Sequence, residues 1–370
     1  MTTQTLADLR PVPAMGAARA ERVSPQVTRP APSARRVVQV SSSVVVLVAL
    51  LAVALPSVSG ASWDASMGAM SAVSLPTLAA LTALWLVGLW AYSFVLSASL
   101  PGLSKRQGFV LNLVGSGVSN LVPFGGALGV GVTWKMARQY GFTHRAIGLF
   151  TGVTGIWNLL ARLALPVAGL AALLLVGADV GGPVLVAAGA GAAVCAAIIA
   201  LVVVALSSER AGAHLISGAA ALWGRLARLV GRDAPAGLEA SLASQRESAV
   251  ELLKRGRGRL VVGMLAYLVL QGLLMWACLA AVGSDLGWAE VTAGYALGRM
   301  LTTVVLTPGG TGFAETGTAA ALIALGGDPA TTVAGVLLFS FFTFVCEIPG
   351  GAIAYLWHLA ARSWHRPIAT

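Results

Sequence analysis

The chain has 370 residues, of which 57% are hydrophobic and only 10% are charged, and its mean hydropathy is +0.83. This composition excludes a soluble globular domain and predicts an all-α, polytopic helical membrane protein. The formal net charge of +10 is typical of cytoplasmic loops that contact anionic lipid, so we expect no nucleic-acid partner.

Residues 1–36 precede the first hydrophobic run and are rich in proline, alanine and arginine. This segment is too long for the basic start of a signal peptide, so we expect a disordered basic arm in the cytoplasm. A transmembrane domain is expected over residues 37–360, followed by a cytoplasmic tail at 361–370.

The transmembrane domain contains hydrophobic segments that each exceed the roughly 20 residues a helix needs to cross a bilayer. They cover residues 37–57, 75–99, 107–134, 146–176, 182–206, 259–283, 291–325 and 330–358. The segments 107–134 and 291–325 carry a proline and several glycines near their middle. The other six are expected to be full spans.

Lysine and arginine are distributed unevenly among the connecting loops. The loops 58–74, 177–181, 284–290 and 326–329 contain acidic residues but no lysine or arginine. The remaining loops and both chain ends are basic, so both termini and the loop 207–258 are expected in the cytoplasm of a cell-membrane protein. Segment 107–134 then begins and ends in the cytoplasm, and segment 291–325 begins and ends outside. Each is therefore predicted to be a re-entrant helical hairpin.

The tips of the two predicted hairpins resemble each other. The first reads NLVPFGGALG and the second VLTPGGTGFAETG. Matching breaks with opposite flanking charge indicate an inverted repeat with discontinuous helices, whose tips meet and line a cavity. The simpler alternative is that these residues only kink ordinary membrane helices. The tip residues that we expect at a substrate site are Asn120, Pro123, Gly125, Gly126, Pro308, Gly309, Gly310, Thr311 and Gly312.

Few ionisable residues fall inside the predicted spans, and these are Arg162, Arg299, Glu315 and Glu347. Charges in a bilayer are costly and usually face a cavity or one another, so we add all four to the candidate substrate site. Glu315 follows the second tip, where a carboxylate can either cap a half-helix or bind a cation such as Arg299. With Arg299 it would hold a zwitterionic or phosphate-bearing head group.

Arg162 lies four residues after Asn158, so the two side chains share one helix face and Asn158 joins the candidate site. Arg162 alternatively snorkels to the membrane surface. Glu347, just before Pro349, either pairs with an arginine or satisfies freed backbone groups. The loop 207–258 contains an amphipathic stretch that suits the lipid interface, and a plain solvated connector explains it equally well.

At its two tips the chain resembles the lysylphosphatidylglycerol synthase transmembrane-region family, which is related to the flippase domain of the multiple peptide resistance factor. The likeness rests on NLVPFGGALG and especially on TPGGTGFAETG. It implies two re-entrant hairpins and the translocation of lipids or lipid-linked substrates. The synthases also carry a soluble aminoacyl-transferring domain. This chain ends shortly after its last span, so we expect that it does not make the aminoacyl lipid by itself.

Three functions compete. The first is a flippase that moves a phospholipid or a lipid-linked, phosphate-bearing substrate between the hairpins. The second is a membrane enzyme, which the sequence disfavours because no catalytic motif or embedded histidine accompanies the polar residues. The third is a scaffold for lipid or envelope-glycan synthesis. We expect no cofactor and no metal. The expected partners are anionic, zwitterionic or polyprenyl-phosphate-linked lipids, and a homo-oligomer or envelope-synthesis enzymes stay open.

Overall fold

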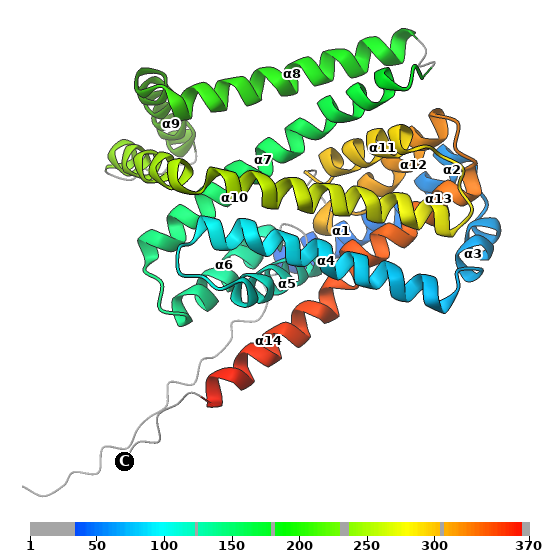
Figure 1. The fold of residues 1–370 in the computed structure, drawn as a ribbon, viewed down its shortest axis with the longest axis horizontal. Coiled ribbons are helices and arrows are strands. Elements are labelled where there is room, and N and C mark those ends of the chain that lie inside the picture. Colours follow the sequence, from blue (N-terminus) through cyan, green and yellow to red (C-terminus); the bar gives the residue numbers. More distant parts are fainter. Residues whose placement is uncertain (1–33, 123–124, 179–181, 230–236, 304–306, 365–370) are drawn as a thin grey trace, which may run out of the picture.

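The structure is a computed structural model that describes residues 34–122, 125–178, 182–229, 237–303 and 307–364. These residues form helices joined by short turns, and no strand occurs among them. The predicted all-α class is confirmed (Figure 1).

The helices fall into two halves of the chain, each with a broken helix pair. The first half contains α1 (Ala34–Ala49), the π-helical turn η1 (Leu50–Ala54), α2 (Leu55–Ser59), α3 (Trp63–Ser71), α4 (Leu75–Ser99), α5 (Lys105–Leu121), α6 (Gly125–Gln139), α7 (His144–Leu175) and α8 (Gly182–Ser207). The second contains α9 (Glu209–Leu229), α10 (Leu238–Ala281), α11 (Trp288–Leu301), the 3-10 turn η2 (Pro308–Gly310), α12 (Phe313–Ala324), α13 (Pro329–Ser340), the π-helical turn η3 (Phe341–Val345) and α14 (Glu347–Trp364).

Among the residues that the structure describes, six helical stretches are long and apolar enough to cross a membrane. They are Ser41–Ser59, Leu75–Ser99, His144–Leu175, Ala188–Ser207, Gly258–Ala281 and Pro329–Ala360. These are the six full spans that hydropathy predicts. The two remaining hydrophobic segments become the helix pairs α5–α6 and α11–α12, which break where the sequence has its Pro-Gly motifs. Whether the pairs re-enter from opposite faces of a bilayer stays a prediction.

Capping residues determine where several helices begin after the turns. Ser104 accepts from the backbone N–H of Gln107 while the Gln107 side chain accepts from the N–H of Ser104, which forms a capping box at the start of α5. Ser74, Thr143 and Asp328 cap α4, α7 and α13 in the simpler way, by accepting one backbone N–H. Polar caps of this kind satisfy the free N–H groups of a helix end.

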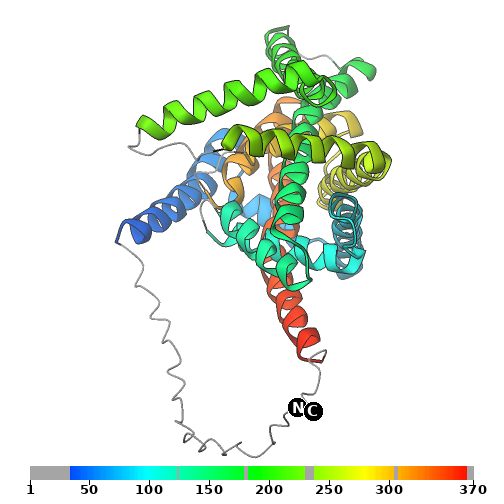
Figure 2. The ribbon, with the colours of Figure 1, turned by 90° about the vertical axis from the view of Figure 1, so that its left-hand side faces the viewer.

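The packing of the two halves is reciprocal. Helices α4 and α10 lie along each other, α11 of the second broken pair packs on α7, and α5 of the first packs on α14 (Figures 1 and 2). Each broken pair thus rests against a long helix of the other half. This exchange is what an inverted repeat predicts, and it brings both breaks to the centre of the molecule.

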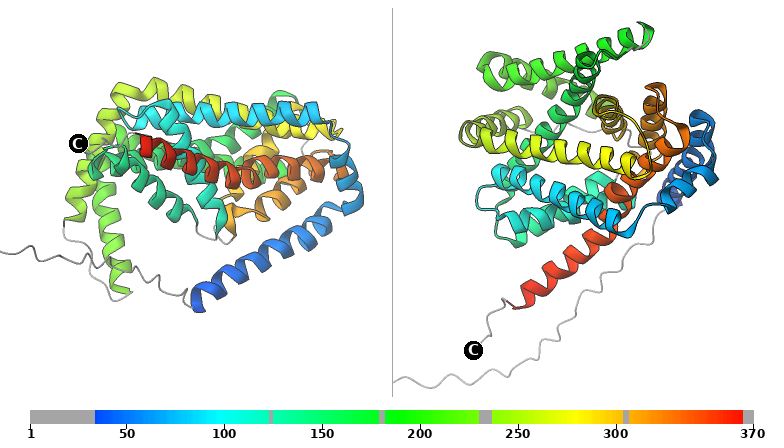
Figure 3. Two further views of the ribbon diagram at one scale, coloured as in Figure 1. Left: turned by 90° about the horizontal axis from the view of Figure 1, so that it is seen from below. Right: turned by 45° about the vertical axis from the view of Figure 1, so that its right-hand side comes forward.

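Two parts lie at the edge of this arrangement. Helix α8 contacts mainly α7 and α9, and α1 slants away from the bundle so that η1 and α2 make the contacts with α12 (Figure 3). Within the loop predicted at 207–258, the described residues are mostly helical: α9 covers Glu209–Leu229, and α10 continues from Leu238 into the next span. On α9, Leu215 and Leu222 are exposed. The position of α9 at the lipid interface stays a prediction.

The second break depends on glycine geometry at Gly310. Its φ is +76°, and a Cβ added there would lie 2.7 Å from the Thr302 Cα atom. We expect Gly310→Ala to lower the free energy of unfolding by about 2 kcal/mol or more, through backbone strain and this clash together. Thermal unfolding in detergent, followed by tryptophan fluorescence, measures the loss.

The matched control for this prediction is Gly177→Ala. Gly177 has a similar φ of +64°, and nothing lies within 4 Å of an added Cβ. The control therefore carries the strain without the clash. Equal losses in both variants would show that the approach of Gly310 to Thr302 does not shape the break.

Candidate functional site

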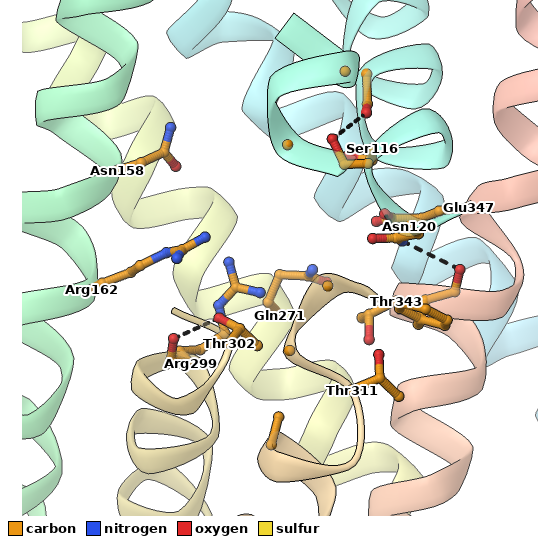
Figure 4. Close-up of a pocket in the computed structure, with 18 of the residues that line it drawn as sticks. Ser116, Asn120, Asn158, Arg162, Gln271, Arg299, Thr302, Thr311, Thr343 and Glu347 are labelled. Atoms are coloured by element: carbon orange, nitrogen blue, oxygen red, sulfur yellow. Dashed lines mark hydrogen bonds between the residues drawn. The ribbon is translucent and has the colours of Figure 1, made fainter. Parts of the chain in front are cut away.

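A polar cavity of about 660 Å³ lies where the two broken helix pairs meet. Its walls come from α5 and α6 of the first pair, from α11, η2 and α12 of the second, and from the long helices α4, α7, α10, α13 and α14 (Figure 4). Polar groups inside a membrane bundle are tolerated where protein or a water-filled cavity satisfies them. The broken backbone of both pairs borders such a cavity.

The two tips contact each other through Asn120. A Cβ added to Gly309 would lie 3.1 Å from Asn120 Oδ1 and 2.8 Å from the Phe344 ring. The Asn120 amide donates to the Phe344 carbonyl oxygen (3.3 Å) and to Glu347 Oε2 (3.1 Å). The prediction that the tips meet and line one cavity is confirmed, whereas their depth in a bilayer stays a prediction.

Arg162 of α7 and Arg299 of α11 both line this cavity. Figure 4 shows their guanidinium groups reaching toward each other from two walls. The two like charges interact electrostatically. Among the described residues neither guanidinium has an ion-pair partner, and the buried Nε atom of each has no hydrogen-bond partner. Arg162 is therefore a cavity residue, and snorkelling does not describe it.

Asn158 lies on the same face of α7 as Arg162, as the i, i+4 spacing predicts, and it also lines the cavity. Its amide donates to the Tyr92 hydroxyl (2.6 Å) and to the Thr154 carbonyl oxygen (2.8 Å). These bonds fix the Asn158 side chain against α4. The helix face that carries Arg162 is thus held toward the cavity.

Glu315 caps α12. Its Oε2 accepts from the Gly312 N–H at 2.5 Å, and its Oε1 accepts from the Ser340 hydroxyl. The carboxylate is buried, with 6% of its residue surface exposed. Of the alternatives that the sequence leaves open, the structure shows the cap, and the pairing of Glu315 with Arg299 does not occur.

Glu347 is buried at the start of α14 and accepts a hydrogen bond from Asn120 of the first tip. Its charge acts favourably on Arg299, but no ion pair joins the two among the described residues. Of the roles that the sequence leaves open for Glu347, the direct pair with an arginine is therefore not seen. The carboxylate joins the first tip to the last span.

The structure places some of the other predicted site residues on the cavity wall and others outside it. Gly125, Gly126, Gly309, Gly310 and Thr311 line the cavity. Pro308 and Gly312 shape the second break but are not among the lining residues, since Pro308 begins η2 and Gly312 precedes α12. Pro123 lies outside the described residues.

Several uncharged polar residues of the cavity are not predicted from the sequence, because the prediction considers only charged side chains inside the spans. Examples are Tyr92, Gln271, Tyr295 and Thr307, all of which line the cavity. Gln271 gave a usable signal, because an amide in the middle of the apolar run LAYLVLQGLLMW is costly unless it faces a polar site. Tyr92 and Tyr295 give no such signal in the sequence, because a tyrosine in a span suits the core and an interface equally well.

The described residues contain no group of three His, Cys, Asp or Glu side chains that could hold a metal ion. A comparison with family models matches residues 40–350 of the chain to the family described as Lysylphosphatidylglycerol synthase TM region. No curated protein matches the chain. The family match covers both broken helix pairs and all the walls of the cavity.

Proposed function

Because the chain belongs to the lysylphosphatidylglycerol synthase transmembrane-region family, we propose that it moves a phospholipid or a lipid-linked, phosphate-bearing substrate across the membrane. The route is the cavity between the two broken helix pairs. The proposal treats both pairs as re-entrant hairpins of an inverted repeat, and the protein as a non-enzymatic transporter.

One observation carries the proposal: two arginines with no ion-pair partner among the described residues line the cavity between the broken helix pairs, and the Nε atom of each lacks a hydrogen bond there. A buried, unpaired cation costs several kcal/mol, so such residues in membrane proteins mark substrate paths. A scaffold needs no internal cavity with unsatisfied charges. Broken helices at the repeat interface are also the usual place for a transported substrate.

The uneven distribution of lysine and arginine supports a cell-membrane protein with both termini in the cytoplasm. In that orientation the α5–α6 tip reaches the cavity from the cytoplasmic side and the α11–α12 tip from the outside. Rocking of one half against the other would expose the arginines to each side in turn.

The test is lipid transfer in proteoliposomes with fluorescent phospholipids and polyprenyl-phosphate analogues. We expect transfer that depends on the head group, and a loss of about tenfold or more in Arg299→Gln, since one charge-assisted contact is removed. Arg259→Gln is the matched control, because Arg259 is exposed and lies outside the cavity.

Transfer of no lipid by the folded wild-type protein would reject transport and leave the scaffold. Equal transfer by wild type and Arg299→Gln would reject the route through this cavity.

A further inference from the structure

The strongest unexplained feature of the cavity is its unsatisfied hydrogen-bonding groups. Atoms without a partner among the described residues gather on its walls, namely Arg162 Nε, Arg299 Nε, Gln271 Oε1, Tyr295 OH and Thr307 Oγ1. Gln271 and Tyr295 expose 2% of their surface and Thr307 1%. Buried polar groups in folded proteins are nearly always paired, so a cluster of exceptions at one place points to a binding site for a polar ligand.

The chemistry of these groups favours an anion. The arginines can only donate hydrogen bonds, and the hydroxyls of Tyr295 and Thr307 can also donate. The Gln271 amide donates to the Tyr267 hydroxyl (3.4 Å). With the two ends of the amide exchanged, Tyr267 would donate to Gln271 Oε1 and the NH₂ group would take the place of the unpaired oxygen. A ligand that offers several acceptor oxygens would therefore satisfy the whole set.

The charges of the cavity agree with this chemistry. Arg162 and Arg299 repel each other, and an anion between them would turn that repulsion into two attractions. The carboxylates are engaged elsewhere, since Glu315 accepts from Gly312 and Ser340 and Glu347 accepts from Asn120. No free carboxylate among the described lining residues is left to receive a cationic group.

Geometry distinguishes a phosphate from other anions. Two guanidinium groups approach from different walls, α7 and α11 (Figure 4), and each offers a planar fork that fits two oxygens. The two oxygens of a carboxylate lie in one plane and suit one planar fork best. A terminal phosphate has three oxygens that are free of ester bonds, arranged in different directions, so it can serve both forks.

We propose that Arg162 and Arg299 together bind one terminal phosphate group in this cavity, with Gln271, Tyr295 and Thr307 completing its hydrogen bonds. The proposal rests on the transport function proposed above, because it names the group of the substrate that the site holds. The phosphate belongs either to a lipid monoester or to free phosphate, which share this chemistry.

Binding to the purified full-length protein in detergent tests the proposal without measuring transport. The probes are short-chain phosphatidic acid, inorganic phosphate and, as the neutral control, the matching diacylglycerol. Affinity is read from tryptophan fluorescence and from the rise of the unfolding temperature with ligand concentration. The variants are Arg162→Gln, Arg299→Gln and Arg162→Lys, with Arg259→Gln as the matched control.

We expect phosphatidic acid to bind, and each glutamine variant to bind it at least about tenfold more weakly. Arg162→Lys should be intermediate, because lysine keeps the charge and loses the fork. Without ligand, Arg162→Gln should unfold at a higher temperature than wild type, since the repulsion with Arg299 is gone. A merely structural arginine would give the opposite shift.

Binding of inorganic phosphate with the same arginine dependence would support the site with a free ion as its ligand. Equal binding of diacylglycerol, or wild-type affinity in both glutamine variants, would overturn the proposal. Lipid transfer that persists without arginine-dependent binding rejects the phosphate site alone. Arginine-dependent binding without transfer rejects transport and leaves the phosphate site in place.

Discussion

Replacing Glu347 with alanine is expected to lower the free energy of unfolding by about 1.5–3 kcal/mol, the range for a hydrogen bond to a charged group. Glu347 is 8% exposed and accepts a hydrogen bond from Asn120 at 3.1 Å. Its charge also offsets that of Arg299. Its removal leaves the Asn120 amide without this acceptor. Thermal or denaturant unfolding in detergent measures the loss.

A double-mutant cycle separates the two contacts of Glu347. Asn120→Ala alone removes the hydrogen bond to Glu347, which costs about 1.5–3 kcal/mol, together with the bond to the Phe344 carbonyl oxygen. If the bond between Asn120 and Glu347 holds the first tip to α14, the losses of the two single variants should not add in the double variant. The exposed Glu247 provides the control, and Glu247→Ala should change stability by less than about 0.5 kcal/mol. Additive losses would show that the tip and α14 are held together by other contacts.

The spans and the two breaks could be predicted because they rest on local properties of the sequence. A run of some 20 apolar residues is sufficient for a span, and proline with glycine is sufficient to interrupt a helix. The capping role of Glu315 was also within reach, since its contact with Gly312 spans three residues. Local signals of this kind do not depend on how the helices pack.

Which carboxylate acts on Arg299 could not be predicted in this way. Of the two carboxylates inside the predicted spans, Glu315 lies 16 positions from Arg299 in the sequence and Glu347 lies 48 positions away. Which of the two acts on the arginine depends on the rotation of α12 and α14 about their axes. That rotation follows from packing, for instance from Gly117 of α5, where a Cβ would lie 2.6 Å from the Glu347 carbonyl oxygen. A single sequence does not encode such contacts in its spacing.

Filling the cavity is expected to have the largest effect on transport. Gly126 lines the cavity in the first turn of α6, and nothing lies within 4 Å of a Cβ added there. Gly126→Trp should therefore fold, since its side chain meets open space, while its indole occupies the path between the tips. We expect lipid transfer in proteoliposomes to fall to the level of protein-free vesicles.

Gly155→Trp is the matched control for Gly126→Trp. Gly155 is an exposed helical glycine of α7, also has nothing within 4 Å of an added Cβ, and is not among the cavity-lining residues. The same tryptophan there should leave transfer near the wild-type rate, because it faces away from the cavity.

Transfer that survives in a folded Gly126→Trp variant would mean that lipid crosses along the outer surface of the bundle. Loss in both variants would attribute the effect to the added indole itself. Loss in Gly126→Trp alone ties transport to the space between the two tips, since the indole enters the cavity in that variant only.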